Sequence, residues 1–518
     1  MIRPPRPMAR RAALSAAVMV TLVAAGAPSP APLGIGDRLF PHLGNPGYDV
    51  RAYDIAFDYS GSNREPLRAV TSIDARATES LSRLNLDFAR GEVRSVEVNG
   101  EPARFRTVGE DLAVTPAEPV ADGAPLRMRI AHTSSTRGSD GGWLRTEDGL
   151  AMANQPDAAH RVFPCNDHPS DKARFTFRIT TPPGLTAVAS GLRLSGEDAD
   201  RGISGEGTGR APGRKPRAAD GRTTWTYRGV HPMAPELAQV SIGRSAVIGR
   251  EGPHDLPMRD VVPAADRGRL GRWLAKTPAQ ISWMESKVGP YPFENYGVLI
   301  AAAETGFELE TQTLSLFERG LFTDSRYPEP YVESVMVHEL AHQWFGDSVS
   351  PERWTDLWLN EAHATWYEAL YAEEKADVSL TERMRQAYAS SDGWRAEGGP
   401  PADPKVPDPG SKISIFRPIA YDGSALVLYA LRERIGTAAF DRLQRAWVTR
   451  HRDSHASTAD FIALASEISG KDQSGFLRPW LYATKTPPMP GHPEWRSERH
   501  GTGIGTLLGP VLHPGKHR

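Results

Sequence analysis

Residues 337–347 read Val-His-Glu-Leu-Ala-His-Gln-Trp-Phe-Gly-Asp, and residues 358–361 read Trp-Leu-Asn-Glu. Side chains four residues apart lie on one face of a helix, so His338 and His342 can direct one imidazole nitrogen each at a common metal ion. Glu339 lies beside them, and Glu361 follows His342 by 19 residues. We therefore predict a zinc site with the ligands His338, His342 and Glu361.

Chance is the simplest alternative to this interpretation. A bare His-Glu-x-x-His arises in about 3% of chains of this length and histidine content, and requiring a glutamate at a suitable distance lowers that frequency to about 0.5%. A metal site is therefore the better explanation before any other part of the chain is considered.

Length and composition fit a globular protein of two domains. The chain has 518 residues, a hydrophobic content of 39% and a formal net charge of −2. This length exceeds what one ordinary hydrophobic core needs, and no charge excess suggests nucleic acid as a partner. Cys165 is the single cysteine, so no intrachain disulfide can form, and we expect it to be a small buried residue.

The N-terminus has the pattern of an export signal. Four arginines within residues 3–11 precede an apolar run, residues 12–25, and residues 25–27 (Ala-Gly-Ala) form a small-x-small cleavage motif. We predict a signal peptide over residues 1–27, of either the general secretory or the twin-arginine type, and a secreted, extracellular mature protein. No later stretch approaches about 18 uninterrupted apolar residues, so we expect no stable membrane insertion.

The hydrophobic pattern changes in the middle of the chain. Up to about residue 250, apolar residues recur at every second position, as in residues 53–57 (YDIAF), which is typical of strands. Beyond residue 260 the spacing becomes helical. We predict helices over residues 270–288, 331–345, 361–374, 424–435, 438–450 and 458–468.

The fold class is therefore predicted to be α+β. An N-terminal β-sheet domain with a sandwich-like arrangement, residues 28–250, precedes a mainly helical domain, residues 251–490. Residues 201–222, rich in glycine, arginine and proline, are predicted to form a long loop. Residues 491–518 are predicted to form a flexible tail.

Several further segments resemble, in the same order, those of the gluzincin aminopeptidases, the family of aminopeptidase N and the leukotriene-epoxide hydrolase. Besides the two quoted first, they are residues 161–169 (RVFPCNDHP), 233–235 (MAP), 289–293 (GPYPF) and 421–426 (YDGSAL). The resemblance implies a β-sheet domain followed by a thermolysin-like catalytic domain, which agrees with the change in periodicity. Typical relatives add a large helical domain after the catalytic one, and we expect a short form without it here.

The resemblance implies a zinc-dependent aminopeptidase, with one zinc ion per chain, that acts on peptides with a free N-terminus. Zinc with three protein ligands keeps a fourth position for water and lowers the pKa of that water from about 15.7 towards about 7. We expect Glu339 to act as the general base on this water. Tyr421 matches the family's transition-state tyrosine. A thermolysin-like endopeptidase, or an inactive relative that acts as a binding protein, is the alternative.

An aminopeptidase also needs an anionic site for the substrate's α-ammonium group. The resemblance places residues 304–311 (ETGFELET) at this site, and the best match sets Glu310 on the family's glutamate. Glu308 lies two residues earlier on the same face of an extended segment and could bind the amine instead. The candidate substrate-binding residues are thus Glu310, Glu308, Gly306 and, from the β-sheet domain, Gln155. The preferred N-terminal residue and the oligomeric state stay open.

Other residues in these motifs are expected to have structural roles. We expect Asp347 to support a ligand histidine from behind. Arg161, Asp167 and Lys172 are expected to fix the β-sheet domain against the catalytic domain through ion pairs. Five aromatic residues are assigned to the core: Trp344, Phe345, Trp354, Trp358 and Trp366.

Overall fold

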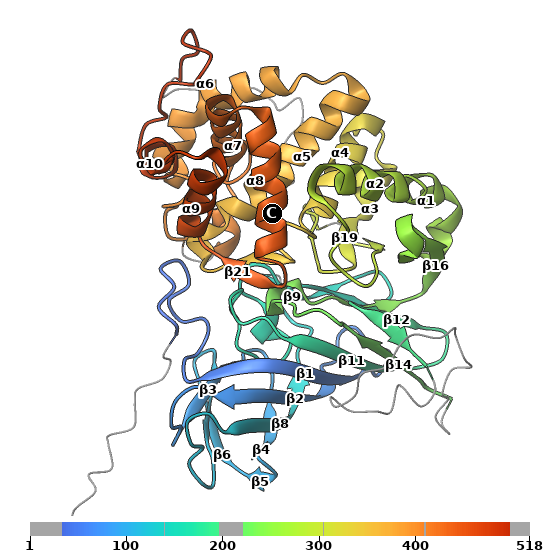
Figure 1. Ribbon diagram of the computed structural model, residues 1–518. Coiled ribbons are helices and arrows are strands. Elements are labelled where there is room, and N and C mark those ends of the chain that lie inside the picture. The colour runs from blue at the N-terminus through green and yellow to red at the C-terminus, as the bar shows by residue number, and fades with distance from the viewer. Residues whose placement is uncertain (1–33, 139, 196–220, 304, 409–410, 498–518) are drawn as a thin grey trace, which may run out of the picture. The chain divides into compact units, whose positions relative to one another are not determined.

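The computed structural model describes residues 34–138, 140–195, 221–303, 305–408 and 411–497. The predicted signal peptide, nearly all of the predicted loop over residues 201–222, and most of the predicted tail lie outside these ranges. Strands predominate up to residue 243 and helices after it (Figure 1), so the predicted α+β class is confirmed. We call residues 34–243 the β-rich part and residues 245–497 the helical part; the predicted domain boundary at residue 250 stays a prediction.

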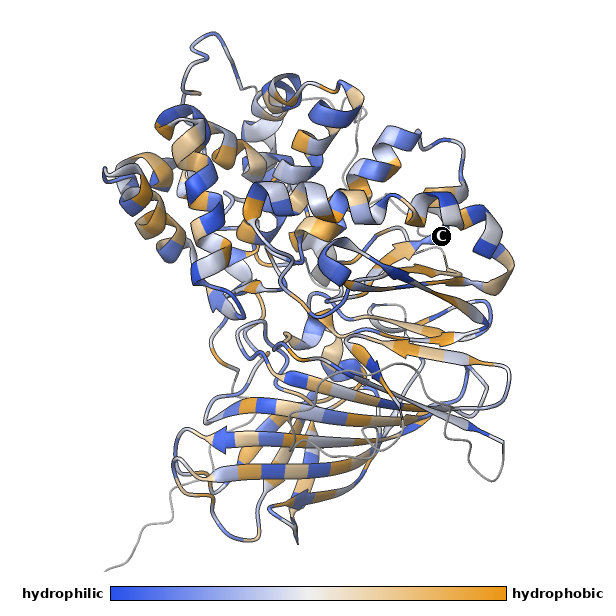
Figure 2. Ribbon diagram, turned by 45° about the vertical axis from the view of Figure 1, so that its right-hand side comes forward, coloured by the Kyte–Doolittle hydropathy of each residue, from blue (hydrophilic) through white to orange (hydrophobic). Residues whose placement is uncertain are grey.

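An eight-stranded sheet forms most of the β-rich part. Its order is β13-β14-β11-β1-β2-β8-β4-β5, antiparallel except for the pair β1 and β11. The strands are β1 (Tyr48–Asp58), β2 (Leu67–Ala77), β4 (Val93–Val98), β5 (Glu101–Pro102), β8 (Pro125–Ser134), β11 (Arg174–Thr181), β13 (Leu192–Leu194) and β14 (Thr223–Arg228). Hydrophobic and hydrophilic residues alternate along the long strands (Figure 2), so one face is apolar and packs on the core.

Two smaller sheets complete the β-rich part. One has the order β3-β7-β6 and the other β12-β15-β10-β9. The strands are β3 (Leu84–Asp87), β6 (Arg104–Val108), β7 (Asp111–Thr115), β9 (Gly142–Arg145), β10 (Leu150–Ala153), β12 (Thr186–Ala189) and β15 (Val240–Gly243). Cys165 is a free thiol fully buried in this core, as expected for a small apolar residue.

The helical part begins with a four-stranded sheet of order β16-β17-β18-β19, in which only β16 is antiparallel to its neighbour. Its strands are β16 (Ser245–Glu251), β17 (Pro257–Pro263), β18 (Val298–Ala301) and β19 (Ser315–Glu318). A short parallel pair, β20 (Val349–Pro351) and β21 (Ser454–Ala456), lies later in the chain. The helices are α1 (Arg267–Leu274), α2 (Thr277–Val288), α3 (Arg319–Thr323), α4 (Glu329–Ala341), α5 (Trp358–Ala376), α6 (Leu380–Gly398), α7 (Asp422–Ile435), α8 (Thr437–Arg450), α9 (Thr458–Ser469) and α10 (Ser474–Tyr482).

All six predicted helices are present, the first of them divided into α1 and α2. The five aromatic residues assigned to the core are each at most 3% exposed. The predicted tail begins at residue 491, yet Trp495 is only 8% exposed and stacks on His492, so packing extends into that segment. Within the described ranges, no helix combines the length and the apolar character needed to cross a membrane.

The contact between the two parts differs from the prediction. Lys172 does cross from the β-rich part, but its ammonium group donates to the backbone carbonyls of Asp347, at 2.6 Å, and Ser348, at 2.9 Å. Arg161 and Asp167 form their ion pairs inside the β-rich part. The predicted set of ion pairs across this contact is therefore wrong, because buried carbonyl oxygens satisfy the lysine in place of carboxylates.

A short segment near the start of the described chain packs against the helical part. Leu39 and Phe40 join an apolar cluster that includes Trp354 and Tyr421. The carboxylate of Asp37 accepts hydrogen bonds from the backbone N–H of Leu39, at 2.7 Å, and of Trp354, at 2.8 Å. The segment is thus fixed by both apolar and polar contacts.

Candidate active site

The structure brings the three predicted metal ligands together. His338 and His342 project from the end of α4, and Glu361 projects from the first turn of α5, which packs beside α4 (Figure 1). All three are at most 2% exposed. Glu361 Oε2 lies 3.5 Å from His338 Nε2 and 3.6 Å from His342 Nε2.

These separations fit a zinc ion. Two ligand atoms bound at about 2.0–2.2 Å in a tetrahedron are about 3.3–3.6 Å apart. The same separations are too long for good hydrogen bonds, and Glu361 Oε2 has no hydrogen-bond partner within the described chain. A buried carboxylate oxygen without a donor calls for a cation. Two imidazoles and one carboxylate are a donor set that suits zinc with one open position.

Each ligand histidine is oriented by an acceptor on its other ring nitrogen. Glu368 Oε2 lies 3.0 Å from His338 Nδ1, and the carbonyl oxygen of Phe345 lies 3.1 Å from His342 Nδ1. Such bonds direct each Nε2 towards the metal. Gly346 has a φ of +133°, and a Cβ there would lie 3.3 Å from His342 Nδ1, so this position needs glycine.

The role expected for Asp347 is wrong. Its carboxylate contacts neither ligand histidine and instead accepts a hydrogen bond from Gln343 Nε2 at 2.7 Å. The tight turn after His342 explains this, since the backbone carbonyl of Phe345 already occupies the Nδ1 side of the ring.

The carboxylates give the site a preference for positive charge. Burial favours the neutral imidazole, but Glu361 and Glu368 raise the pKa of His338 to about 9. Burial likewise favours a neutral His342, but Glu310 and Glu361 raise its pKa to about 9. Burial would raise the pKa of Glu361, yet the two imidazoles hold it at about 2. A site that stabilises protonated imidazoles will also attract a divalent cation, which displaces the protons.

Glu339 and Tyr421 face the same space. Glu339 is 2% exposed, and its Oε2 has no hydrogen-bond partner among the described residues. Burial, together with the charges of Glu310 and Glu308, raises the pKa of Glu339. The ring centroid of Tyr421, just before α7, lies 6.0 Å from that of His338. Burial and the charge of Glu361 raise the pKa of Tyr421, so its hydroxyl keeps its proton and can donate.

Glu310 and Gln155 meet at the edge of this space. A carboxylate oxygen of Glu310 lies within 4.8 Å of potential ligand atoms of both Glu339 and His342. Gln155 Nε2, from the β-rich part, donates to Glu310 Oε1 at 2.6 Å. The two halves of the chain thus both contribute to one acidic group beside the metal ligands.

The other two candidates lie on the same segment. Glu308 is 8% exposed, and burial and the charge of Glu318 raise its pKa. Gly306 has a φ of +76°, and its N–H donates to Glu318 Oε2 at 2.9 Å. Gly306 therefore shapes the loop, with its N–H already bonded to a side chain of β19.

Sequence reasoning missed three residues that support the site. Arg383, on α6, donates to Glu368 Oε1 at 2.9 Å and to Asp422 Oδ1 at 2.7 Å, so it links the partner of His338 to the residue after Tyr421. Gln343 Nε2 donates to the carbonyl oxygen of Glu310 at 3.1 Å. A signal existed for Glu368, which follows Glu361 by seven residues and shares its face of α5.

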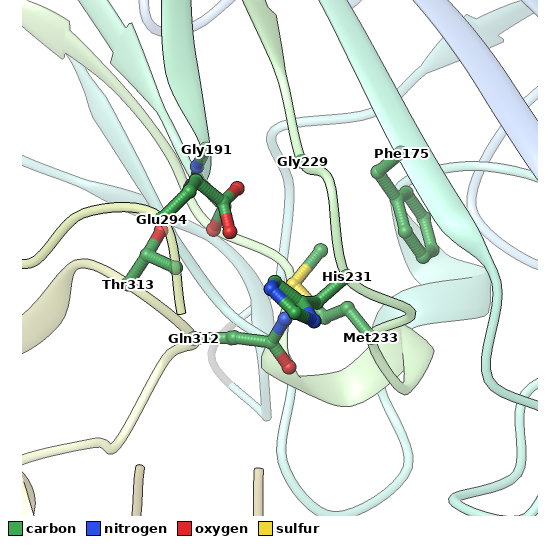
Figure 3. Close-up of a pocket in the computed structure, with 9 residues that line it drawn as sticks. Phe175, Gly191, Gly229, His231, Met233, Glu294, Gln312 and Thr313 are labelled. Atoms are coloured by element: carbon green, nitrogen blue, oxygen red, sulfur yellow. Dashed lines mark hydrogen bonds between the residues drawn. The ribbon is translucent and has the colours of Figure 1, made fainter. Parts of the chain in front are cut away.

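A separate small pocket, open to solvent, lies between the two parts (Figure 3). The β-rich part contributes Phe175, His231 and Met233 to its lining, and the helical part contributes Glu294, Gln312 and Thr313. None of the predicted site residues lines it.

Comparison with known proteins links this chain to a peptidase family. Residues 273–480 match the peptidase family M1 domain. The chain is 26% identical over 458 residues to aminopeptidase N of Streptomyces lividans, covering 83% of this chain and 50% of that protein. It is 24% identical over 432 residues to aminopeptidase 2 of Candida albicans, covering 79% of this chain and 44% of that protein. The chain thus spans about half the length of the curated relatives it matches.

Solved structures give the same result over a longer stretch. An M1 zinc metallopeptidase from Deinococcus radiodurans has a TM-score of 0.72 and 28% identity, covering 88% of this chain and 98% of that one. The chain thus resembles peptidase family M1, the gluzincin aminopeptidases, to which its sequence motifs also point. Zinc is the metal that this family indicates for the site of His338, His342 and Glu361.

Proposed function

We propose that this chain is a zinc aminopeptidase that removes the N-terminal residue from peptides. The observation that carries this proposal is the position of Glu310, an acidic side chain held by Gln155 within 4.8 Å of Glu339 and His342. An anion at this distance from the ligands can bind the substrate's α-ammonium group and so align the first peptide bond with the metal site. An endopeptidase has no use for such a group.

The residues of this chain divide the catalytic work among them. Zinc, when bound, would supply a Lewis acid that polarises the scissile carbonyl and lowers the pKa of water. Glu339, buried beside the ligands, would take a proton from the attacking water and give it to the leaving amine. Its raised pKa suits a group that must hold this proton between the two transfers. The Tyr421 hydroxyl would donate to the oxygen on which negative charge develops.

A solved relative supports a peptide substrate. A mutant of the Deinococcus radiodurans M1 zinc metallopeptidase has been solved with a Tyr-Ser-Ala substrate bound. A tripeptide substrate in that relative is consistent with the pairing of an anionic group with a metal site in the present chain.

The proposal is tested by comparing free and blocked substrates. Glu310→Ala should raise KM for aminoacyl amides far more than for the N-acetylated forms, while Glu339→Gln should bind zinc as well as wild type and lose at least about 100-fold in kcat. Equal effects of Glu310→Ala on free and acetylated substrates would reject amine recognition. Cleavage of a peptide blocked at both ends would favour an endopeptidase.

We also propose that the protein is exported. The arginines within residues 3–11, the apolar run of residues 12–25 and the small residues 25–27 support a signal peptide. Mass spectrometry of protein recovered from the culture medium of an expressing cell should find a mature chain that begins near residue 28. Recovery only from the cytosol, with residues 1–27 retained, would refute export.

A further inference from the structure

We propose that Glu308 forms a subsite for a positively charged side chain, so that the enzyme prefers peptides that begin with arginine or lysine. This inference rests on the proposed aminopeptidase function and specifies its substrate class.

The backbone around Leu309 determines where Glu308 points. Leu309 and Leu316 exchange both backbone hydrogen bonds, at 2.9 and 2.8 Å, which holds the segment extended. Side chains on either side of an extended residue share a face, so Glu308 projects to the same side as Glu310, about 6–7 Å along the chain. Electrostatic contacts agree, because the charge of Glu308 acts on Glu339 and Tyr421.

Glu308 is a buried acid without a partner. It is only 8% exposed, and in the described part of the chain no hydrogen bond or salt bridge reaches its carboxylate. Its main electrostatic neighbours are another acid, Glu318, and the ligand His338; no lysine or arginine is among them. A buried carboxylate in this situation is costly to ionise, and a cation that enters beside it removes that cost.

Glu318 cannot neutralise Glu308, because it is itself an acid. Its negative charge instead strengthens the attraction for a cation. Its Oε2 already accepts hydrogen bonds from the N–H groups of Thr305, at 3.1 Å, and Gly306, at 2.9 Å, so this carboxylate is fixed beside Glu308. Two carboxylates that repel each other in this way suit a guanidinium or ammonium group between them.

The substrate itself can bring that cation. When its α-ammonium group is bound to Glu310, the first residue of the peptide can direct its side chain along the extended segment, towards Glu308. The spacing of about 6–7 Å between alternate residues is comparable to the span of a lysine or arginine side chain with its flexible stem. Glu310 would then bind the α-ammonium group of the first residue, and Glu308 would bind the charged end of its side chain.

The experiment compares substrates with similar aliphatic stems that differ in charge. Amides of arginine, lysine and norleucine are assayed with wild type, Glu308→Gln and Glu310→Gln, with thermal unfolding as a check on folding. Wild type should favour arginine and lysine over norleucine. Glu308→Gln should lower kcat/KM for the two cationic substrates by about 10- to 100-fold and change that for norleucine by less than about threefold. Glu310→Gln should lower all three together.

A binding measurement gives a second readout. Calorimetry with the Glu339→Gln variant should find tighter binding of arginine amide than of norleucine amide, and adding Glu308→Gln should abolish the difference. If wild type hydrolyses norleucine amide as efficiently as the arginine and lysine amides, this inference is wrong and the proposed function stands. If Glu308→Gln lowers kcat/KM equally for all three amides, this inference is also wrong, and Glu308 instead binds the α-ammonium group. If none of the three amides is hydrolysed, both the proposed function and this inference are rejected.

Discussion

Gln343 connects the metal ligands to the substrate-binding segment, and its replacement by leucine should destabilise the fold. The side chain is fully buried: Nε2 donates to the carbonyl oxygen of Glu310 and to Asp347 Oδ2, and Oε1 accepts from Thr313 N at 2.9 Å. Leucine would leave the Thr313 N–H, the Glu310 carbonyl and the Asp347 carboxylate without these partners. At about 1–3 kcal/mol for each orphaned group, partly offset by the apolar surface of leucine, the loss should be about 2–4 kcal/mol.

The chain offers a matched control for this change. Gln444, on α8, is 1% exposed, and neither amide atom has a hydrogen-bond partner among the described residues. Gln444→Leu should therefore be neutral or stabilising. Urea denaturation at pH 7 measures both variants, and the KM for aminoacyl amides should rise in Gln343→Leu because the backbone of Glu310 loses its anchor. A loss below about 1 kcal/mol in Gln343→Leu, or an equal loss in Gln444→Leu, would refute the reasoning.

Three further outcomes are expected. Glu368→Gln should weaken zinc binding by about 10- to 100-fold in a chelator competition, and unchanged affinity would show that it does not orient His338. Tyr421→Phe should lower kcat by about 100-fold or more with little change in KM, and near-normal kcat would remove its transition-state role. Burial lowers the pKa of His132 to about 4 from 6.5, so the unfolded chain takes up its proton first as the pH falls. The stability due to this neutral ring is complete above about pH 6.5 and is lost towards pH 4. Wild type should thus lose about 3 kcal/mol more than His132→Gln over this interval, whereas a pH-independent difference would contradict the pKa.

The metal ligands could be predicted because their geometry is contained in helical spacing. His338 lies in the last turn of α4, His342 caps the C-terminal end of that helix, and Glu361 lies in the first turn of the next long helix, so few arrangements of the chain could separate them. Gln343 shows the limit of this reasoning. It is adjacent to a ligand, but its hydrogen-bond partners come from segments around residues 310 and 347. The hydrophobic periodicity of a sequence does not predict such hydrogen bonds between distant segments.

Helix α6 was missed for a related reason. Its buried face includes Ser391 and Arg395, so the apolar stripe that signals a helix is interrupted. Arg395 donates to the carbonyl oxygens of Trp480 and Ala483, both at 2.7 Å, and so satisfies the C-terminal end of α10. Arg395, a charged residue that the sequence alone suggests to be exposed, is therefore buried in the packing of α6 against α10.

The docking of Leu39 and Phe40 beside Tyr421 has a consequence for biosynthesis. Contacts between residues so distant in sequence form late, because the entropy of closing the intervening loop must be overcome first. A growing polypeptide can fold its β-rich part early, but the surroundings of Tyr421 are complete only after synthesis has passed α7. Any activity that depends on this tyrosine is therefore delayed until α7 has been made.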